Sequence, residues 1–304
     1  MGESSGDRAT RRAWAALPDG GRDALIDGLS PSELQTVLLD VSRSRAASVT
    51  PARVMQRWRQ DRFVQPSTAD PRELVKVQAL LWDRLPDRFA GVELSPLAPL
   101  GTCSAVATVD QNKVVSTIRG TEVASDPTNE LALEAAVRRR AGAARVDLAA
   151  CQRVVRAQAV EGPGLFAHFQ LFALVSSARD TGSGRVEAEM LVDHLTFWQD
   201  VLGEQAQFSF TSFAQTAVRE RIDDTVRPAL RAPFVEEPDR SKGSSYYAGT
   251  AIGIGCGDDE LGDGGFTRWT ADLLGDAKER CLISCISTER LAAIIGRTAF
   301  SRGV

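Results

Sequence analysis

The sequence predicts an α+β fold in which helices flank an antiparallel sheet, preceded by a helical extension at the N-terminus. Apolar residues in the first part of the chain have helical spacing, whereas residues 146–155 and 166–176 are apolar, strand-like runs joined by a Gly- and Pro-rich loop. Strands and helices do not alternate regularly along the chain, which argues against a doubly wound parallel sheet.

The N-terminal segment is expected to be helical. From residue 25 to residue 41 apolar side chains recur at intervals of three and four, and Ser30-Pro31 with an acid at position 33 is typical of a helix start. We assign residues 1–65 to this helical extension and residues 66–304 to the core. The extension could dock an acceptor, brace a dimer or cover a site.

The core is predicted to begin with a helix over residues 70–85, opened by Asp70-Pro71 and stopped by Pro86. Three short strand-like runs follow, at residues 92–94, 105–109 and 114–118. A further helix ends in three arginines near residue 140, and Asp126 and Thr128 precede it. An acid and a hydroxyl group therefore lie at the positive end of that helix.

The two apolar runs at 146–155 and 166–176 predict a hairpin. The rest of the chain predicts helices and strands in this order: helices over 186–202 and 214–222, a strand over 246–255, a helix over 266–274, a strand over 281–287 and a helix over 289–295.

Composition narrows the class of function. The 304 residues carry 36 Lys and Arg against 40 Asp and Glu, and the formal charge of −4 gives no general attraction to nucleic acid. No apolar run has the length of a membrane helix, and the first twenty residues lack the apolar core of a signal peptide. We expect a cytoplasmic protein without a membrane partner.

Cysteine and histidine usage does not predict a metal site. The five cysteines lack CxxC spacing, and His168 and His194 are the only histidines. Cys281 and Cys285 are interpreted as small buried apolar residues, and the spacing gives no support to a nucleophilic Cys–His pair.

Three stretches of the core form a recognisable series. The first contains Arg156 and Gln158, a Gly-Pro-Gly loop and Phe169; the second runs from Lys242 through Tyr246-Tyr247 to Thr250; the third contains Gly264-Gly265 and, later, Glu289-Arg290. Together they resemble the motifs of class II aminoacyl-tRNA synthetases, most closely the histidyl-tRNA synthetase catalytic core and its truncated paralogues. The resemblance covers roughly residues 86–300 and implies a six- to seven-stranded antiparallel sheet, without an anticodon-binding domain.

The resemblance also implies roles for individual residues. Arg156 would hold the α-phosphate of ATP and the substrate carboxylate, Phe169 and Arg290 would pack on the two faces of adenine, and Mg²⁺ would neutralise the remaining phosphate charge. The site predicted in this way comprises catalytic residues Arg156, Lys242 and Arg290, nucleotide-binding residues Arg156, Gln158, Phe169, Glu289 and Arg290, and substrate-binding residues Asp126, Thr128, Leu171, Val175, Tyr246 and Tyr247.

Departures from the family pattern change the expected substrate. Gln158 stands where the family has an acid, and Lys242 stands where it has a catalytic arginine, so weaker ATP binding and altered catalysis are expected. Leu171 and Val175 replace the polar residues that bind histidine. A pocket built from them would leave the polar groups of histidine unpaired, at about 1–3 kcal/mol each, and would not favour it.

The resulting prediction is a ligase that activates an amino acid or a related carboxylic acid with ATP as an acyl-adenylate. The acyl group would pass to a small acceptor or a carrier protein, and tRNA is not expected as the acceptor. The alternative is a non-catalytic regulatory paralogue that resembles the regulatory subunit of ATP phosphoribosyltransferase, and the third possibility is an unrelated α+β fold. Residues 71–85 and 92–99 match the outline of the family's dimerisation motif, which implies a homodimer.

Overall fold

The computed structural model describes residues 5–158, 166–214, 217–241, 243 and 246–301. The chain divides into two compact units, one of residues 1–61 with 117–121 and one of residues 62–116 with 122–304. The first unit contains the predicted N-terminal helices: α1 (Ser5–Trp14), α2 (Gly21–Asp23), the π-turn η1 (Ala24–Gly28), α3 (Pro31–Ala47) and α4 (Pro51–Gln60).

Helix α3 begins where the sequence predicts. Ser30 is its N-cap, Pro31 is its first residue, and the Ser30 backbone N–H donates to the Glu33 carboxylate at 2.8 Å in a capping box. Among the described side chains of helices α1 to α4, none is buried.

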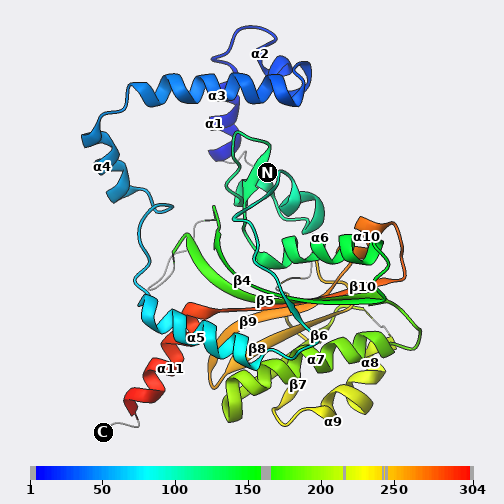
Figure 1. Ribbon diagram of the computed structural model, residues 1–304. Helices are drawn as coiled ribbons and strands as arrows, with labels where there is room; N and C mark the ends of the chain where they lie inside the picture. Colours follow the sequence, from blue (N-terminus) through cyan, green and yellow to red (C-terminus); the bar gives the residue numbers. More distant parts are fainter. Residues whose placement is uncertain (1–4, 159–165, 215–216, 242, 244–245, 302–304) are drawn as a thin grey trace. The chain divides into compact units, whose positions relative to one another are not determined.

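The second unit is built on a sheet of eight strands (Figure 1). Their order across the sheet is β1 (Ala90–Gly91), β4 (Arg145–Val155), β5 (His168–Arg179), β10 (Glu279–Ser287), β9 (Asp259–Thr267), β8 (Thr250–Cys256), β6 (Ala206–Ser212) and β7 (Phe234–Glu236). The six long strands pair antiparallel, and the short edge strands β1 and β7 pair parallel to their neighbours. The α+β prediction is therefore confirmed, with two short edge strands beyond the six long ones.

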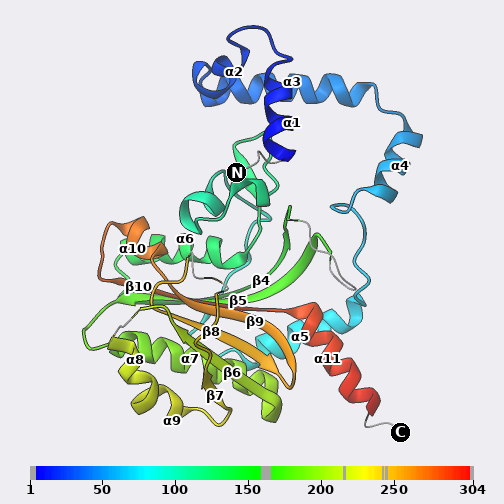
Figure 2. The ribbon, with the colours of Figure 1, turned by 180° about the vertical axis from the view of Figure 1, so that it is seen from behind.

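Helices cover both faces of this sheet, as Figures 1 and 2 show. One face carries α6 (Pro127–Arg140) and α10 (Trp269–Leu274). The other carries α5 (Pro71–Arg84), α7 (Arg185–Leu202) and α11 (Thr288–Ser301), with α8 (Ala217–Arg221), the π-turn η5 (Ile222–Val226) and α9 (Arg227–Ala229) beside α7. The larger core lies under α7 around Phe172, Phe197 and Trp198, and a smaller one lies under α6.

The predicted hairpin forms two neighbouring strands of the sheet, next to the short edge strand β1. Strands β4 and β5 pair from Arg145 opposite Ala178 to Val155 opposite His168. This register places Arg156 directly beyond the last pair, at the end of the sheet where α6 begins. The predicted helices over 70–85 and 186–202 are also present, as α5 and α7.

Several local predictions were wrong. The strands expected over 92–94 and 114–118 are not formed, and the second range has only an isolated bridge from Ser116 to Glu122. Residues 102–106 form a π-helical turn, η2 (Thr102–Val106), where a strand was expected over 105–109; the nearby short elements are β2 (Leu97–Pro99), β3 (Thr121–Val123) and the 3₁₀ turn η3 (Gln111–Lys113). Strand β6 was missed, and the helix expected from residue 266 begins only at Trp269, because residues 259–267 form β9.

Glycines explain why β9 resembles a loop in the sequence. Its residues include Gly262, Gly264 and Gly265, which are poor strand formers. A Cβ at Gly264 would overlap the backbone of Ile283 and Ser284 on the neighbouring strand β10, so close strand packing requires glycine there. In the parts of the chain that are described, no helix is both long enough and apolar enough to cross a membrane.

Candidate functional site

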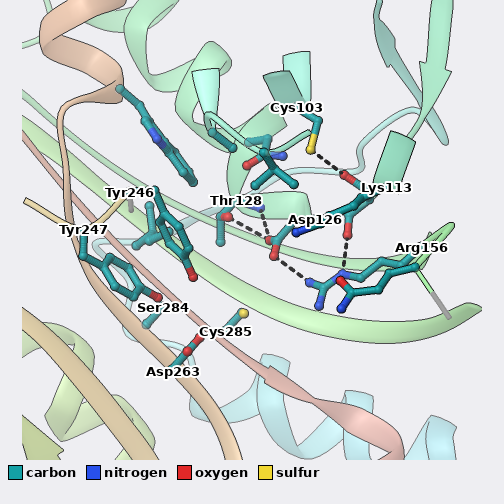
Figure 3. Close-up of a pocket in the computed structure, with 17 residues that line it drawn as sticks. Cys103, Lys113, Asp126, Thr128, Arg156, Tyr246, Tyr247, Asp263, Ser284 and Cys285 are labelled. Atoms are coloured by element: carbon teal, nitrogen blue, oxygen red, sulfur yellow. Dashed lines mark hydrogen bonds and ion pairs between the residues drawn. The ribbon is translucent and has the colours of Figure 1, made fainter. Parts of the chain in front are cut away.

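A cavity of about 240 Å³ lies on the sheet face that carries α6 and α10 (Figure 3). Six of the predicted site residues line it: Asp126, Thr128, Arg156, Gln158, Tyr246 and Tyr247. The other lining residues are Cys103, Ala107, Val109, Lys113, Ser125, Asn129, Asp263, Trp269, Ile283, Ser284 and Cys285. The size suits a ligand as small as an amino acid, because pockets for drug-sized ligands start at about 300 Å³.

An ion pair joins the hairpin to the start of α6 within this cavity. The Arg156 guanidinium donates to Asp126 Oδ2 at 2.9 Å and to the Ser125 carbonyl oxygen at 3.0 Å. Asp126 is the N-cap of α6, and its Oδ1 accepts from the Thr128 backbone N–H and from the Thr128 hydroxyl. The side chains of Arg156 and Asp126 are 41% and 25% exposed, so a ligand can reach both.

The remaining residues predicted from the hairpin lie beside the cavity or beneath it. The Arg156 guanidinium lies over the Phe169 ring, 5.0 Å from its centroid, and the ring packs on Leu171, Ala124 and Val154. Leu171 is 5% exposed in that cluster, and Val175 is fully buried in the core under α6. Phe169, Leu171 and Val175 are not among the lining residues.

The tyrosine pair forms one wall of the cavity. The rings of Tyr246 and Tyr247 lie 4.3 Å apart, and Tyr247 is buried. Burial raises the pKa of Tyr246 to about 12 and raises the pKa of Tyr247 well above its usual value, so both hydroxyl groups are neutral at physiological pH. Gly265 makes room for Tyr247, because a Cβ there would lie 2.6 Å from its ring. Lys242, predicted as catalytic, lies outside the described residues.

The predicted motif 3 residues lie at the start of α11, away from the cavity. The Glu289 carboxylate accepts from the Gln170 backbone N–H at 2.9 Å and from Arg153 at 3.2 Å. Arg290 is exposed and donates to the Glu260 carbonyl oxygen at 3.1 Å. Neither Glu289 nor Arg290 lines the cavity, so the structure does not bring Arg290 and Phe169 together there.

Several lining residues were not singled out as site residues in the sequence. Asp263 forms an ion pair of 2.7 Å with Arg240 and lies opposite Cys285 across the β9–β10 ladder. Cys285 is half-buried and its sulfur points into the cavity, in contrast to Cys281, which is buried as expected. The only sequence signal for Asp263 was its position directly before Gly264-Gly265.

A buried polar network lies in the sheet beneath the cavity. The His194 ring bonds Ser284 through Nδ1 at 2.8 Å and Ser176 through Nε2 at 2.9 Å, and the Trp198 Nε1–H donates to the Ser284 hydroxyl at 2.9 Å. Ser176 donates its hydroxyl proton to Asp147 at 2.5 Å, so it must accept from His194. The proton of the neutral ring is therefore on Nε2, and Nδ1 accepts from Ser284.

Two ionisable groups near the site have strongly shifted pKa values. Burial, with the positive charges of Arg145 and Arg88, lowers the pKa of His194 to about 3, so the ring is neutral. Burial raises the pKa of Glu130, in the first turn of α6, to about 8, and the charge of Asp126 adds to this rise. The Glu130 Oε2 atom is buried without a hydrogen-bond partner, which fits a protonated carboxyl group at neutral pH.

The arrangement can bind a zwitterion. The Arg156 guanidinium suits a carboxylate and the Asp126 carboxylate suits an ammonium group, while aromatic and aliphatic side chains form much of the remaining wall. Among the residues that the structure describes, no group of three or more His, Cys, Asp or Glu side chains could hold a metal ion.

This architecture is similar to that of several solved aminoacyl-tRNA synthetases. An ATP phosphoribosyltransferase regulatory subunit/histidyl-tRNA synthetase from Bacillus halodurans C matches with a TM-score of 0.59 and 10% identity, over 75% of this chain and 82% of that one. The histidyl-tRNA synthetase from Nostoc sp. PCC 7120 matches with a TM-score of 0.58 and 13% identity, over 83% and 76%. The pyrrolysyl-tRNA synthetase from Desulfitobacterium hafniense matches with a TM-score of 0.53 and 12% identity, over 81% and 75%.

These likenesses confirm the fold that the sequence motifs predicted. No protein-family model matches the chain, and no curated protein matches it in sequence. The similar structures carry the names of synthetases and of a regulatory subunit, and at identities of 10–13% the likeness shows the fold alone.

Proposed function

We propose that this chain binds an amino acid or a related carboxylic acid in the cavity and activates it with ATP as an acyl-adenylate. The observation that carries the proposal is the meeting of Arg156 and Asp126, from separate elements, in one cavity of amino-acid size. The acyl group would then pass to a small acceptor or a carrier protein.

Binding of the substrate uses the two halves of the ion pair. The substrate carboxylate takes the place of Asp126 on the Arg156 guanidinium, and its ammonium group bonds Asp126 in turn. Because each charge finds a new opposite charge, neither is left unpaired when the Arg156–Asp126 contact opens. Thr128, whose hydroxyl group and backbone N–H bond Asp126, holds the carboxylate in place during the exchange.

Activation then requires the bound carboxylate to meet the α-phosphate. A carboxylate oxygen attacks the α-phosphorus, a new C(O)–O–P bond forms, the bond to pyrophosphate breaks, and pyrophosphate leaves with the electron pair. Arg156 stabilises the negative charge that builds on the phosphoryl oxygens, because its guanidinium remains charged and donates in a plane. Mg²⁺ is expected to accompany the ATP phosphates and to neutralise part of their charge.

The positions of Phe169 and Arg290 favour a second candidate function. This candidate is a regulatory protein that binds an amino acid without activating it. The Phe169 ring is covered by the Arg156 guanidinium, and Arg290 is bonded to the Glu260 backbone outside the cavity. A site for adenine between these two side chains would require both to move, whereas amino-acid binding requires neither Phe169 nor Arg290.

The two functions separate in an ATP–pyrophosphate exchange assay with Mg²⁺ and a panel of amino and other carboxylic acids. The ligase predicts exchange with one acid, and at least a tenfold loss of exchange in Arg156→Ala because a charge-assisted contact is removed. Arg138→Ala is the matched control, since Arg138 is 40% exposed and pairs with Glu134 on α6. Acid binding in calorimetry without any exchange would replace the ligase by the regulator.

A further inference from the structure

Asn129 is a buried polar side chain at the wall of the cavity. It lies in the first turn of α6, is 3% exposed and lines the cavity. Among the described residues its side-chain amide has no hydrogen-bond partner. Neither atom of the amide belongs to the unpaired side-chain atoms that solvent cannot reach. The amide is therefore open to the cavity and available to a ligand.

Three other polar groups of the lining are already bonded within the protein. Asp126 accepts from Arg156 and Thr128, Asp263 pairs with Arg240, and Ser284 bonds His194 and Trp198. Lys113 and Gln158 also line the cavity, but both are exposed to water. Within the described lining, Asn129 is thus a buried group that can both donate to and accept from a bound molecule, whereas the buried Trp269 indole can only donate.

We infer that Asn129 determines specificity by bonding a neutral polar group on the side chain of the bound amino acid. The inference rests on the proposed function, in that the cavity takes an amino acid. It assigns the substrate to amino acids with a hydroxyl or carboxamide side chain, and excludes aliphatic amino acids of the same shape.

The chemistry of the amide supports a neutral group. An amide both donates and accepts, as do hydroxyl and carboxamide groups, whereas a charged side chain calls for an opposite charge. Two charge pairs of the cavity are already balanced, Arg156 with Asp126 and Arg240 with Asp263, and the further cation Lys113 is exposed to water. An aliphatic side chain would bury the Asn129 amide without a partner, which lowers affinity about 5- to 150-fold.

Titration calorimetry on the full chain with matched amino acids tests the inference. The pairs are L-threonine with L-valine and L-asparagine with L-leucine, which differ in hydrogen bonding far more than in shape. The wild-type protein should bind the polar member of a pair at least fivefold more tightly, and Asn129→Ala should bring the two members within about twofold. Asn129→Asp keeps the shape and suits the start of a helix, and since its carboxylate can still accept from a hydroxyl or carboxamide donor, it should retain a preference for the polar member.

Asn112 provides the matched control, because it is the only other asparagine and lies exposed in the turn η3. Asn112→Ala should leave the preference unchanged. Equal binding of both members of each pair, or a preference that survives in Asn129→Ala, would overturn the role of Asn129 while leaving the amino-acid cavity in place. Failure of every amino acid in both pairs to bind would reject this assignment of the substrate, and exchange with another acid would then still support the ligase.

Discussion

The Glu130→Gln variant should show the loss of folding stability at acidic pH that the neutral ring of His194 causes. The folded state holds His194 neutral, with its pKa lowered from 6.5 to about 3. As the pH falls below 6.5 the unfolded chain takes up a proton that the folded chain does not, so the stability that is fully present above pH 6.5 is lost toward pH 3. Each pH unit is worth up to about 1.4 kcal/mol, which gives a loss of about 2 kcal/mol at pH 5.

Glu130 opposes this loss in the wild-type protein. Its pKa is raised from 4.5 to about 8, so the folded state retains a proton that the unfolded chain releases. Stability therefore falls as the pH rises from about 4.5 to 8 and is regained on acidification, by about 2.5 kcal/mol between pH 7 and pH 5. The two effects mask each other, and Glu130→Gln removes one of them.

Urea unfolding followed by tryptophan fluorescence, at pH 7 and pH 5, measures the effect. Glu130→Gln should lose about 2 kcal/mol of unfolding free energy between the two pH values, and Glu130→Gln with His194→Gln should lose much less. His168, the only other histidine, is present in both variants, so its titration cancels. An equal loss in both variants would refute the assignment of the acid sensitivity to the neutral ring of His194.

Two further predictions concern folding stability and are read from thermal or urea unfolding. Arg139→Ala should lower the free energy of unfolding by about 3–5 kcal/mol, because Arg139 and Glu279 form a buried ion pair with side chains 10% and 5% exposed. Arg140→Ala, at the exposed neighbouring position, should change it by less than about 0.5 kcal/mol. Gly264→Ala should destabilise by about 1–3 kcal/mol through overlap with β10, while Gly296→Ala, with open space around it in α11, should stabilise by about 0.5–1 kcal/mol. Equal effects within either pair would contradict the packing described.

The hairpin and the helix starts could be predicted from the sequence because local chemistry determines them. Residues 146–155 and 166–176 are rich in strand-forming side chains, and Asp126 and Ser30 are N-caps in front of prolines. The strand β9 could not be predicted in this way, because tertiary packing against β10 selects its glycines. The three arginines at the end of α6 look alike in the sequence, and only the fold brings Glu279, 140 residues away, beside Arg139.

The site was predictable only in part, for a similar reason. Asp126, Arg156 and the tyrosines belong to motifs that can be recognised in the sequence, and the structure brings them together in one cavity. No local pattern distinguishes Asn129 from any other residue in the first turn of a helix. Its importance comes from what surrounds it, since burial removes water from the amide and the fold supplies no partner in the described structure.

The energetics of Arg156 separate acid binding from adenylation. Its ion pair with Asp126 is partly exposed and is worth at most about 1 kcal/mol, whereas new charge-assisted bonds to a zwitterion contribute about 1.5–3 kcal/mol each. The ion pair therefore does not prevent a ligand from binding. The site is less ready to bind the nucleotide, because the Arg156 guanidinium covers the Phe169 ring and Arg290 donates to the Glu260 carbonyl oxygen. Binding of the amino acid requires only that the Arg156–Asp126 contact be exchanged, whereas adenylation also requires the side chains of Phe169 and Arg290 to move. Pyrophosphate exchange therefore discriminates between the ligase and the regulator.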